Sequence, residues 1–198
     1  METIFPVAIG IGLAAACGFR VFVPLLILNL AALSGHLSLP DDFAWIGSAY
    51  ATMAFATATI IEIVGYYIPL LDHVLDTIAS PAAVIAGTVT TAAMITDISP
   101  FLKWTTALIA GGGIAGLVQA STVAVRAKSS LATAGTANPI FSTMELTGSV
   151  VVALLAVFVP ILGLVLIGIF FIWVVRKILK RLFKRAKAKR EGPFQNRY

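Results

Sequence analysis

Residues 4–34 read IFPVAIGIGLAAACGFRVFVPLLILNLAALS, and Arg20 is the only charged residue among them. A membrane-spanning helix needs roughly 20 mostly apolar residues, so this stretch exceeds the length of one span. Gly18 and Pro24 flank Arg20, and glycine and proline together permit a broken helix in a membrane. We therefore predict an integral membrane protein whose first span, Ile4–Ser34, is interrupted close to the bilayer centre.

The composition of the whole chain supports a membrane protein. Of its 198 residues, 59% are hydrophobic and 12% are charged, and the mean hydropathy is +0.98. Soluble domains carry about 25% charged residues because they must cover themselves with polar groups. The composition therefore excludes an ordinary soluble domain, and the length leaves room for one membrane domain.

We predict an all-α membrane fold of six spans. After Ile4–Ser34 come Phe43–Gly65, Ala82–Thr96, Phe101–Ala127, Ile140–Val159 and Ile161–Val175. Proline cannot donate a backbone hydrogen bond and breaks or bends a helix. If Pro160 only kinks the chain, the last two spans become one helix and the count falls to five.

Two connections differ from simple loops. In residues 65–80, apolar side chains recur at helical spacing, which predicts a short amphipathic or re-entrant helix at the inner interface. The stretch Ser129–Ser142 is small, polar and interrupted by glycine and proline, so it is typical of a re-entrant or cavity-lining connection. Alternatively, Asn138 and Pro139 only begin a helix.

Basic residues gather at the C-terminus and set the predicted orientation. Residues 176–198 hold ten Lys or Arg and one acid, Glu191. Because cytoplasmic segments carry an excess of Lys and Arg, we predict a transmembrane domain over residues 1–175 and a cytoplasmic tail over 176–198. Six spans then place the N-terminus inside and the acidic loop Ser34–Asp42 outside. The tail either binds anionic lipids or only sets the topology, and nucleic acid is not an expected partner.

The positions of the tryptophan and tyrosine residues fit that orientation. Trp45 and Trp104 fall at the outer interface, and Tyr66, Tyr67 and Trp173 fall at the inner interface. Tryptophan and tyrosine concentrate at both interfaces of a membrane protein.

A short likeness between the two halves suggests an internal repeat. Glu62-Ile-Val-Gly65 in the second span resembles Glu145-Leu-Thr-Gly148 in the fifth. Two halves of three spans each would be related by inverted topology, as in several transporter folds. Separately, Gly112 and Gly116 form a Gly-x-x-x-Gly pattern, which predicts close packing against a helix of the same chain or of another.

Ionisable residues within the spans are the candidates for a functional site. A charge in the hydrocarbon region costs several kcal/mol, so it usually faces a partner or a water-filled cavity. Arg20, Glu62 and Glu145 lie within predicted spans, and Asp72 and Asn138 lie in the two unusual connections. We predict that these five residues form a substrate-binding site. The alternative is a structural ion pair between Arg20 and Glu62 or Glu145.

The sequence contains no catalytic motif. No His-Glu-x-x-His, Gly-x-Ser-x-Gly or phosphate-binding glycine-rich loop is present. Asp72, His73 and Asp76 supply too few ligands for a metal site. We therefore predict that the chain is not an enzyme and that it holds no metal or cofactor.

Three stretches resemble the bacterial membrane-protein family catalogued as domain-of-unknown-function family 4126. They are Gly18-Phe-Arg-Val-Phe-Val-Pro-Leu25, Glu62-Ile-Val-Gly-Tyr-Tyr-Ile-Pro-Leu-Leu-Asp-His73 with Ser80-Pro81-Ala82, and Asn138-Pro-Ile-Phe-Ser-Thr-Met-Glu145. The resemblance extends over most of the chain up to about Pro160. It implies a compact multi-span fold in a bacterial inner membrane, and it implies no activity.

Three functional hypotheses follow from these observations. The first is a small transporter or channel-like permease with a polar site near the membrane midplane. The second is a non-transporting scaffold or assembly subunit that binds other proteins or lipids. Apart from function, the partners we expect are a second copy of the chain or another membrane protein. The third is a lipid-handling protein, which depends on segment 65–80 and on the basic tail.

Overall fold

The computed structural model describes residues 4–68, 71–96, 98–133 and 136–170 together with 172, 176 and 180, and for Ile4 and His73 the backbone only. The described residues contain helices and no strand, which confirms the predicted all-α fold. The chain divides into two compact units, Met1–Leu164 and Val165–Tyr198. Most of the predicted tail, and Trp173, lie outside the described residues.

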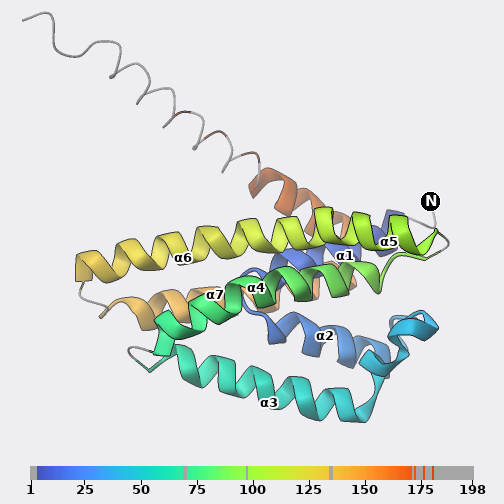
Figure 1. The fold of residues 1–198 in the computed structure, drawn as a ribbon, viewed down its shortest axis with the longest axis horizontal. Helices are drawn as coiled ribbons and strands as arrows, with labels where there is room; N and C mark the ends of the chain where they lie inside the picture. Colours follow the sequence, from blue (N-terminus) through green and yellow to red (C-terminus); the bar gives the residue numbers. More distant parts are fainter. Residues whose placement is uncertain are drawn as a thin grey trace, which may run out of the picture. The chain divides into compact units, whose positions relative to one another are not determined.

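The first unit contains, within its described residues, the start of the helix Pro160–Phe170 and, before it, a series of helical elements coloured along the chain in Figure 1. They are α1 (Ile4–Cys17), α2 (Phe22–Leu33), the 3-10 helix η1 (Asp41–Gly47), α3 (Ala49–Tyr66), α4 (Leu71–Ala92), α5 (Pro100–Thr106), the π-helix η2 (Ala107–Gly112), α6 (Gly113–Thr133) and α7 (Asn138–Phe158). Elements α5, η2 and α6 form one continuous helix, Pro100–Thr133.

Four of these helices are long and apolar enough to cross a membrane: Ala49–Tyr66, Val74–Ala92, Pro100–Thr133 and Asn138–Phe158. Their large exposed side chains are mostly apolar, such as Ile60 and Ile61 on α3 and Leu108 and Ile109 on η2. In a soluble protein such a surface would be a liability, whereas a lipid environment accepts it. The structure therefore supports a multi-pass membrane protein.

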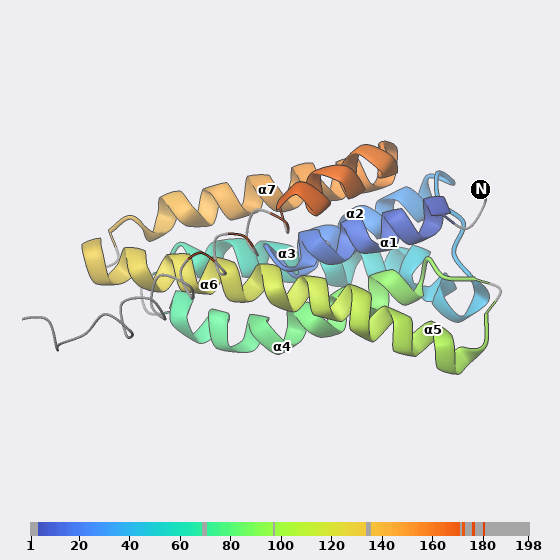
Figure 2. The same cartoon turned by 90° about the horizontal axis from the view of Figure 1, so that it is seen from above.

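The predicted break in Ile4–Ser34 is confirmed, but the segment does not form one span, because its two short helices fold back on each other. α1 has 14 residues and α2 has 12, which gives lengths of roughly 21 and 18 Å at 1.5 Å per residue. Each is too short for a hydrocarbon core of about 30 Å. In Figures 1 and 2 α1 runs inward from one end of the bundle, and α2 returns to that same end.

Side-chain contacts agree with this re-entrant hairpin. We call the end that holds η1 the η1 end. Near it, the hydroxyl of Thr91 in the last turn of α4 donates to the carbonyl of Gly10 in α1 at 3.2 Å. The amide of Asn29 in α2 donates to the carbonyl of Ile46 in η1 at 2.5 Å. Both helices of the hairpin are therefore anchored towards the same end.

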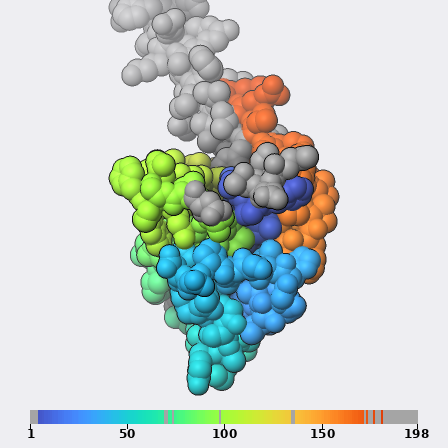
Figure 3. All heavy atoms as spheres, turned by 90° about the vertical axis from the view of Figure 1, so that its right-hand side faces the viewer, coloured from blue at the N-terminus to red at the C-terminus, as the bar shows by residue number. Residues whose placement is uncertain are grey.

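The hairpin changes the predicted topology of the N-terminus. The six-span prediction placed the N-terminus and the loop Ser34–Asp42 on opposite sides of the membrane. The start of α1 and this loop instead lie together at the η1 end, which Figure 3 views directly. His36 in the loop also contacts the ring of Phe158 at the end of α7, with 4.8 Å between ring centroids.

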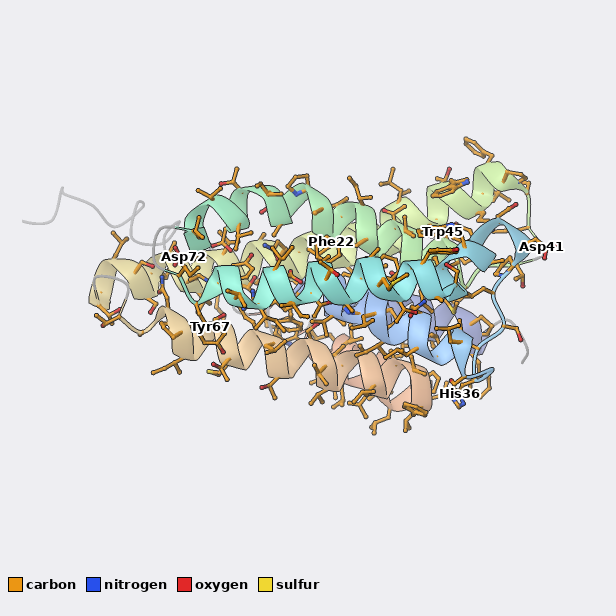
Figure 4. All side chains as sticks on the ribbon, turned by 90° about the horizontal axis from the view of Figure 1, so that it is seen from below. Phe22, His36, Asp41, Trp45, Tyr67 and Asp72 are labelled. Carbon is orange, nitrogen blue, oxygen red and sulfur yellow. The ribbon has the colours of Figure 1, made fainter. Side chains whose placement is uncertain are left out.

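The opposite end holds the α3–α4 and α6–α7 connections, and we call it the Asp72 end. In Figure 4, His36, Asp41 and Trp45 lie at the η1 end and Tyr67 and Asp72 at the Asp72 end. Phe22, the first residue of α2, lies between the two ends. The tip of the hairpin is thus deep inside the bundle. Trp45 and Tyr67 lie at opposite ends of the bundle, as the sequence predicts.

Both unusual connections turn out to be parts of ordinary helices. Segment 65–80 is no separate interfacial helix, because α3 ends at Tyr66 and residues 71–80 are the first turns of α4. Stretch 129–142 is no re-entrant loop either, because α6 continues to Thr133 and α7 begins at Asn138. In both cases a helix continues through polar sequence, because its packing against neighbouring helices stabilises it there.

The chain reverses at Pro160, so α7 and the following helix are not one kinked helix. α7 ends at Phe158, and a separate apolar helix covers Pro160–Phe170. A side chain on Gly163 would lie 3.5 Å from the backbone nitrogen of Ala156. The first turn of the new helix therefore packs back against α7.

The glycines of η2 and α6 pack within the chain. A Cβ added to Gly112 would lie 2.6 Å from the hydroxyl of Thr88, and one on Gly116 would lie 3.1 Å from Val84. Both neighbours are in α4. The Gly-x-x-x-Gly pattern thus serves an intramolecular contact, and the π-helix at Ala107–Gly112 lies at the same junction.

Candidate functional site

Arg20 lies at the tip of the re-entrant hairpin and is 1% exposed. Its Nη2 donates to the carbonyl of Ser142 at 3.0 Å and to the hydroxyl of the same residue at 2.5 Å. The same nitrogen lies 3.6 Å from Oε2 of Glu145. Nε and Nη1 of Arg20 are buried without a hydrogen-bond partner among the described residues. A guanidinium with two unsatisfied buried nitrogens can bind an anion, because its N–H groups are positively charged hydrogen-bond donors.

A second arginine, Arg126 in α6, lies beside it. Its Nη1 donates to Oδ1 of Asp76 in α4 at 2.8 Å, and its Nη2 donates to Oε2 of Glu145 in α7. Its Nε is also buried without a partner among the described residues. Oε2 of Glu145 is therefore shared by two guanidiniums, and this single carboxylate oxygen links three parts of the chain.

Tyr66, in the last turn of α3, packs against both arginines. The Cζ atoms of Arg20 and Arg126 lie 3.8 and 4.3 Å from the centroid of its ring. Its hydroxyl donates to Oδ1 of Asp76 at 3.1 Å. Aromatic faces attract cations, and more strongly where the cation is out of water. Tyr66 thus holds the two guanidiniums side by side in spite of their like charge.

Glu62 binds the backbone at the start of α2. Its Oε1 accepts from the backbone N–H of Val21 at 2.8 Å, and its Oε2 accepts from that of Phe22 at 3.0 Å. The first N–H groups of a helix have no partner within the helix and carry its positive dipole end. In the bilayer interior these groups must be satisfied by protein. Glu62 satisfies two of them, which explains how α2 can begin inside the bundle.

Asp72 and Asn138 form a second polar layer nearer the Asp72 end. Asn138 Nδ2 donates to Oδ2 of Asp72 at 2.6 Å and to the hydroxyl of Ser130 at 3.0 Å. Asp72 is 4% exposed and Asn138 is 7% exposed. The amide therefore joins α4, α6 and α7 and does not merely begin a helix.

The two layers are joined by helical spacing. Asp72 and Asp76 are four residues apart on α4, and Arg126 and Ser130 are four apart on α6. Residues with this spacing lie on the same face of a helix, one turn apart. The polar groups consequently form a column from the hairpin tip towards the Asp72 end.

The half of the first unit on the other side of the hairpin tip is mainly apolar. Its buried cluster joins α1, α2, η1 and the end of α4 through side chains such as Leu13, Leu28, Ile46 and Ala92. The polar column therefore reaches one end of the bundle, while hydrophobic packing occupies the other.

The structure brings some of the predicted site residues into contact and leaves others apart. Arg20 and Glu145 form an ion pair, which is one of the two pairs that the sequence suggests as the alternative to a substrate-binding site. A direct pair between Arg20 and Glu62 is not formed among the described contacts, because the Glu62 carboxylate binds backbone N–H groups instead. Asp72 and Asn138 bind each other and lie one helical turn beyond the cluster.

Sequence reasoning left Arg126, Asp76, Tyr66 and Ser142 out of the site. Arg126 and Asp76 carried a usable signal, since each is ionisable and lies within a long apolar helix. Asp76 also follows Asp72 by one helical turn. Ser142 carried no signal, because a serine in a membrane helix commonly bonds its own backbone.

Arg20, Glu62, Asp76, Arg126 and Glu145 form what we call the buried cluster. Two guanidiniums face three carboxylates, which leaves one negative charge in excess when all five are ionised. Three guanidinium nitrogens have no partner among the described residues. The cluster can therefore accept an anionic group if a carboxylate withdraws or loses its charge.

Comparison with known proteins identifies a family and no relative of known role. The model of the family described as Domain of unknown function (DUF4126) matches residues 7–180. Neither a curated protein nor a solved structure matches the sequence. The match includes every residue of the buried cluster and all of the hairpin except its first three residues.

Proposed function

Because the chain belongs to the DUF4126 family, whose description assigns no activity, we propose a function from the geometry of the buried cluster: transport of small anions across a membrane. The observation that carries this proposal is the set of unpartnered donors on Arg20 and Arg126, deep among apolar helices. Unsatisfied charged donors are costly in such surroundings. A small anion would satisfy them.

The re-entrant hairpin gives a second reason. In transporters with discontinuous helices, half-helix ends near the midplane bind the substrate or a coupling ion. Here α2 begins next to Arg20, and a carboxylate already occupies its first N–H groups. The polar column favours entry of an anion to the buried cluster from the Asp72 end. The apolar packing of the other half favours a path that is closed at the η1 end.

The test is anion flux into liposomes that contain the purified chain, with nitrate as the probe and an ion-selective electrode as the readout. Arg20→Ala is expected to reduce flux at least about tenfold, since it removes a charge-assisted contact of about 1.5–3 kcal/mol. Lys103→Ala is the matched control, because Lys103 faces the exposed Asp42 at 3.9 Å at the η1 end. It should leave flux unchanged.

Arg20→Lys guards against a variant that fails to fold. Lysine keeps the charge and loses the planar fork of donors, so flux should fall while the fold persists. Wild-type flux in folded Arg20→Lys and Arg20→Ala proteins would overturn the proposal.

A scaffold or assembly role is the second candidate. It is favoured by Arg126, whose terminal nitrogens both face carboxylates, as in a structural ion-pair network. This role predicts no flux of any tested anion and a stable complex with a partner in mild detergent. Lipid handling loses the support of segment 65–80, because Asp72 and Asp76 face other helices there.

A further inference from the structure

We infer that Glu145 is a proton-coupled gate for the anion: a small carboxylate or planar oxyanion takes its place between Arg20 and Arg126 when Glu145 takes up one proton. This inference rests on the proposed transport function and adds a substrate class and a stoichiometry. The step requires no bond changes other than protonation. A proton from water binds the Glu145 carboxylate, and the neutral acid leaves its ion pairs to the incoming anion.

The chemical class follows from the group that occupies the position now. Oε2 of Glu145 accepts from Arg126 and lies 3.6 Å from Arg20. A site built around one carboxylate and two guanidiniums fits another planar oxyanion of one charge, because guanidinium donors match that geometry. Formate and nitrate are the smallest probes of this class.

Charge balance explains why a proton must accompany the anion. The buried cluster already holds one more carboxylate than guanidinium, so an added anion alone would leave two excess negative charges in a medium of low dielectric constant. Protonation of one carboxylate cancels the charge that the anion adds. Binding of one anion with one proton therefore leaves the charge of the cluster unchanged.

The geometry selects Glu145 among the three carboxylates. Glu62 uses both oxygens to accept backbone N–H groups, and α2 would lose its first hydrogen bonds if it withdrew. Asp76 accepts from Tyr66 as well as Arg126. Glu145 has contacts through Oε2 only among the described residues, so its withdrawal leaves the backbone intact.

The charged and titratable groups around Glu145 come from the hairpin tip and from three helices. Arg20 at the hairpin tip and Arg126 in α6 pair with Glu145 directly. Tyr66 in α3 and Asp76 in α4 contact those arginines, and Glu62 in α3 binds the start of α2. Neutral Ser142 lies on α7 itself. Glu145 pairs with both arginines, whereas Asp76 pairs with Arg126 and Glu62 binds backbone N–H groups. The charge of Glu145 is therefore the one that an anion placed between the two arginines replaces.

The experiment is calorimetric titration of the full chain in lipid nanodiscs with formate and, separately, nitrate. Two buffers of different ionisation enthalpy give the number of protons taken up per anion bound. We expect about one proton per anion, and an apparent Kd that rises about tenfold per pH unit where Glu145 is ionised. Glu145→Gln should bind the same anions without proton uptake and with a Kd that is independent of pH.

Asp42→Asn is the matched acid-to-amide control at the η1 end, and it should keep the wild-type proton count. Failure of both probes to bind the wild-type protein would overturn this inference together with anion transport. Binding without proton uptake would overturn the inference alone. So would a pH slope that persists in Glu145→Gln and disappears in Glu62→Gln.

Discussion

At the scale of single residues, the stability of this protein depends on how its buried charges are paired. Arg126 lies 3% exposed between Asp76 and Glu145, and Arg20 lies close to the same Glu145 oxygen. Such a network contributes little net stability compared with apolar packing, but removal of one member leaves an uncompensated charge. Each arginine should therefore be costly to remove, whatever the function of the protein.

We expect Arg126→Ala to lower the free energy of unfolding by about 3–5 kcal/mol, because it removes the arginine partner of Asp76 and the nearer of the two arginine partners of Glu145. The readout is the reaction of a maleimide dye with Cys17, which is fully buried and the only cysteine in the chain. The dye reacts only when the protein opens, so its rate during heating reports unfolding.

Lys103→Ala is the control for this measurement. Its pair with Asp42 is long, at 3.9 Å, and the Asp42 side chain is 85% exposed. Ion pairs with an exposed partner contribute about 0–1 kcal/mol. Equal unfolding temperatures for the two variants would show that the contacts of Arg126 add nothing to the fold.

At the scale of elements, the re-entrant hairpin requires a close fit against α6. A Cβ added to Gly18 would lie 2.5 Å from Cβ of Val118 and 2.6 Å from the carbonyl of Ala115. Only a residue without a side chain lets the end of α1 approach α6 this closely. The hairpin tip, and with it Arg20, depends on this contact.

Gly18→Ala should therefore destabilise the protein by about 1–3 kcal/mol through overpacking. Gly113→Ala is the matched control, because a Cβ at Gly113 meets nothing within 4 Å and the residue is helical. Alanine is a better helix former than glycine, so this change should stabilise by about 0.5–1 kcal/mol. The same dye assay compares them, and effects of the same sign would contradict the packing described here.

The elements also show where sequence reasoning succeeds and where it stops. Apolar runs located α3, the α5–α6 helix and α7, because about 20 apolar residues are themselves the physical requirement for a span. The break at Gly18 and Arg20 was predictable, since these residues interrupt an apolar run. The direction of α2 after the break could not be predicted, because it is decided by contacts of Asn29 and Glu62 with residues that are distant in the sequence.

The site was predictable to a similar degree. Arg20 and Glu145 could be paired because an intramembrane charge needs a partner. The partners of Glu62 could not be deduced, because its carboxylate binds backbone N–H groups that are exposed only by the hairpin. The predicted span Phe101–Ala127 ends one residue after Arg126, so the place of this side chain inside the bundle could not be deduced; α6 in fact continues past it to Thr133.

At the scale of the whole molecule, the hairpin decides which segments share a side of the membrane. In the part of the chain that the structure describes, four helices are long and apolar enough to cross, and α1 and α2 both reach the η1 end. The N-terminus and the loop 34–42 should then be on one side, and the α6–α7 connection on the other. A chain whose first 31 apolar residues crossed as one span would place the N-terminus opposite that loop.

Cysteine labelling in intact cells distinguishes the two arrangements. In a Cys17→Ala background, Ser34→Cys, Thr136→Cys and a cysteine added before Met1 are each exposed to a membrane-impermeant maleimide. Ser34 and Thr136 are exposed in the structure and lie at opposite ends. The added cysteine and Ser34→Cys should label from the same side, and Thr136→Cys only from the other. If the added cysteine labels together with Thr136→Cys, α1 crosses the membrane and Arg20 is no longer at the tip of a re-entrant hairpin.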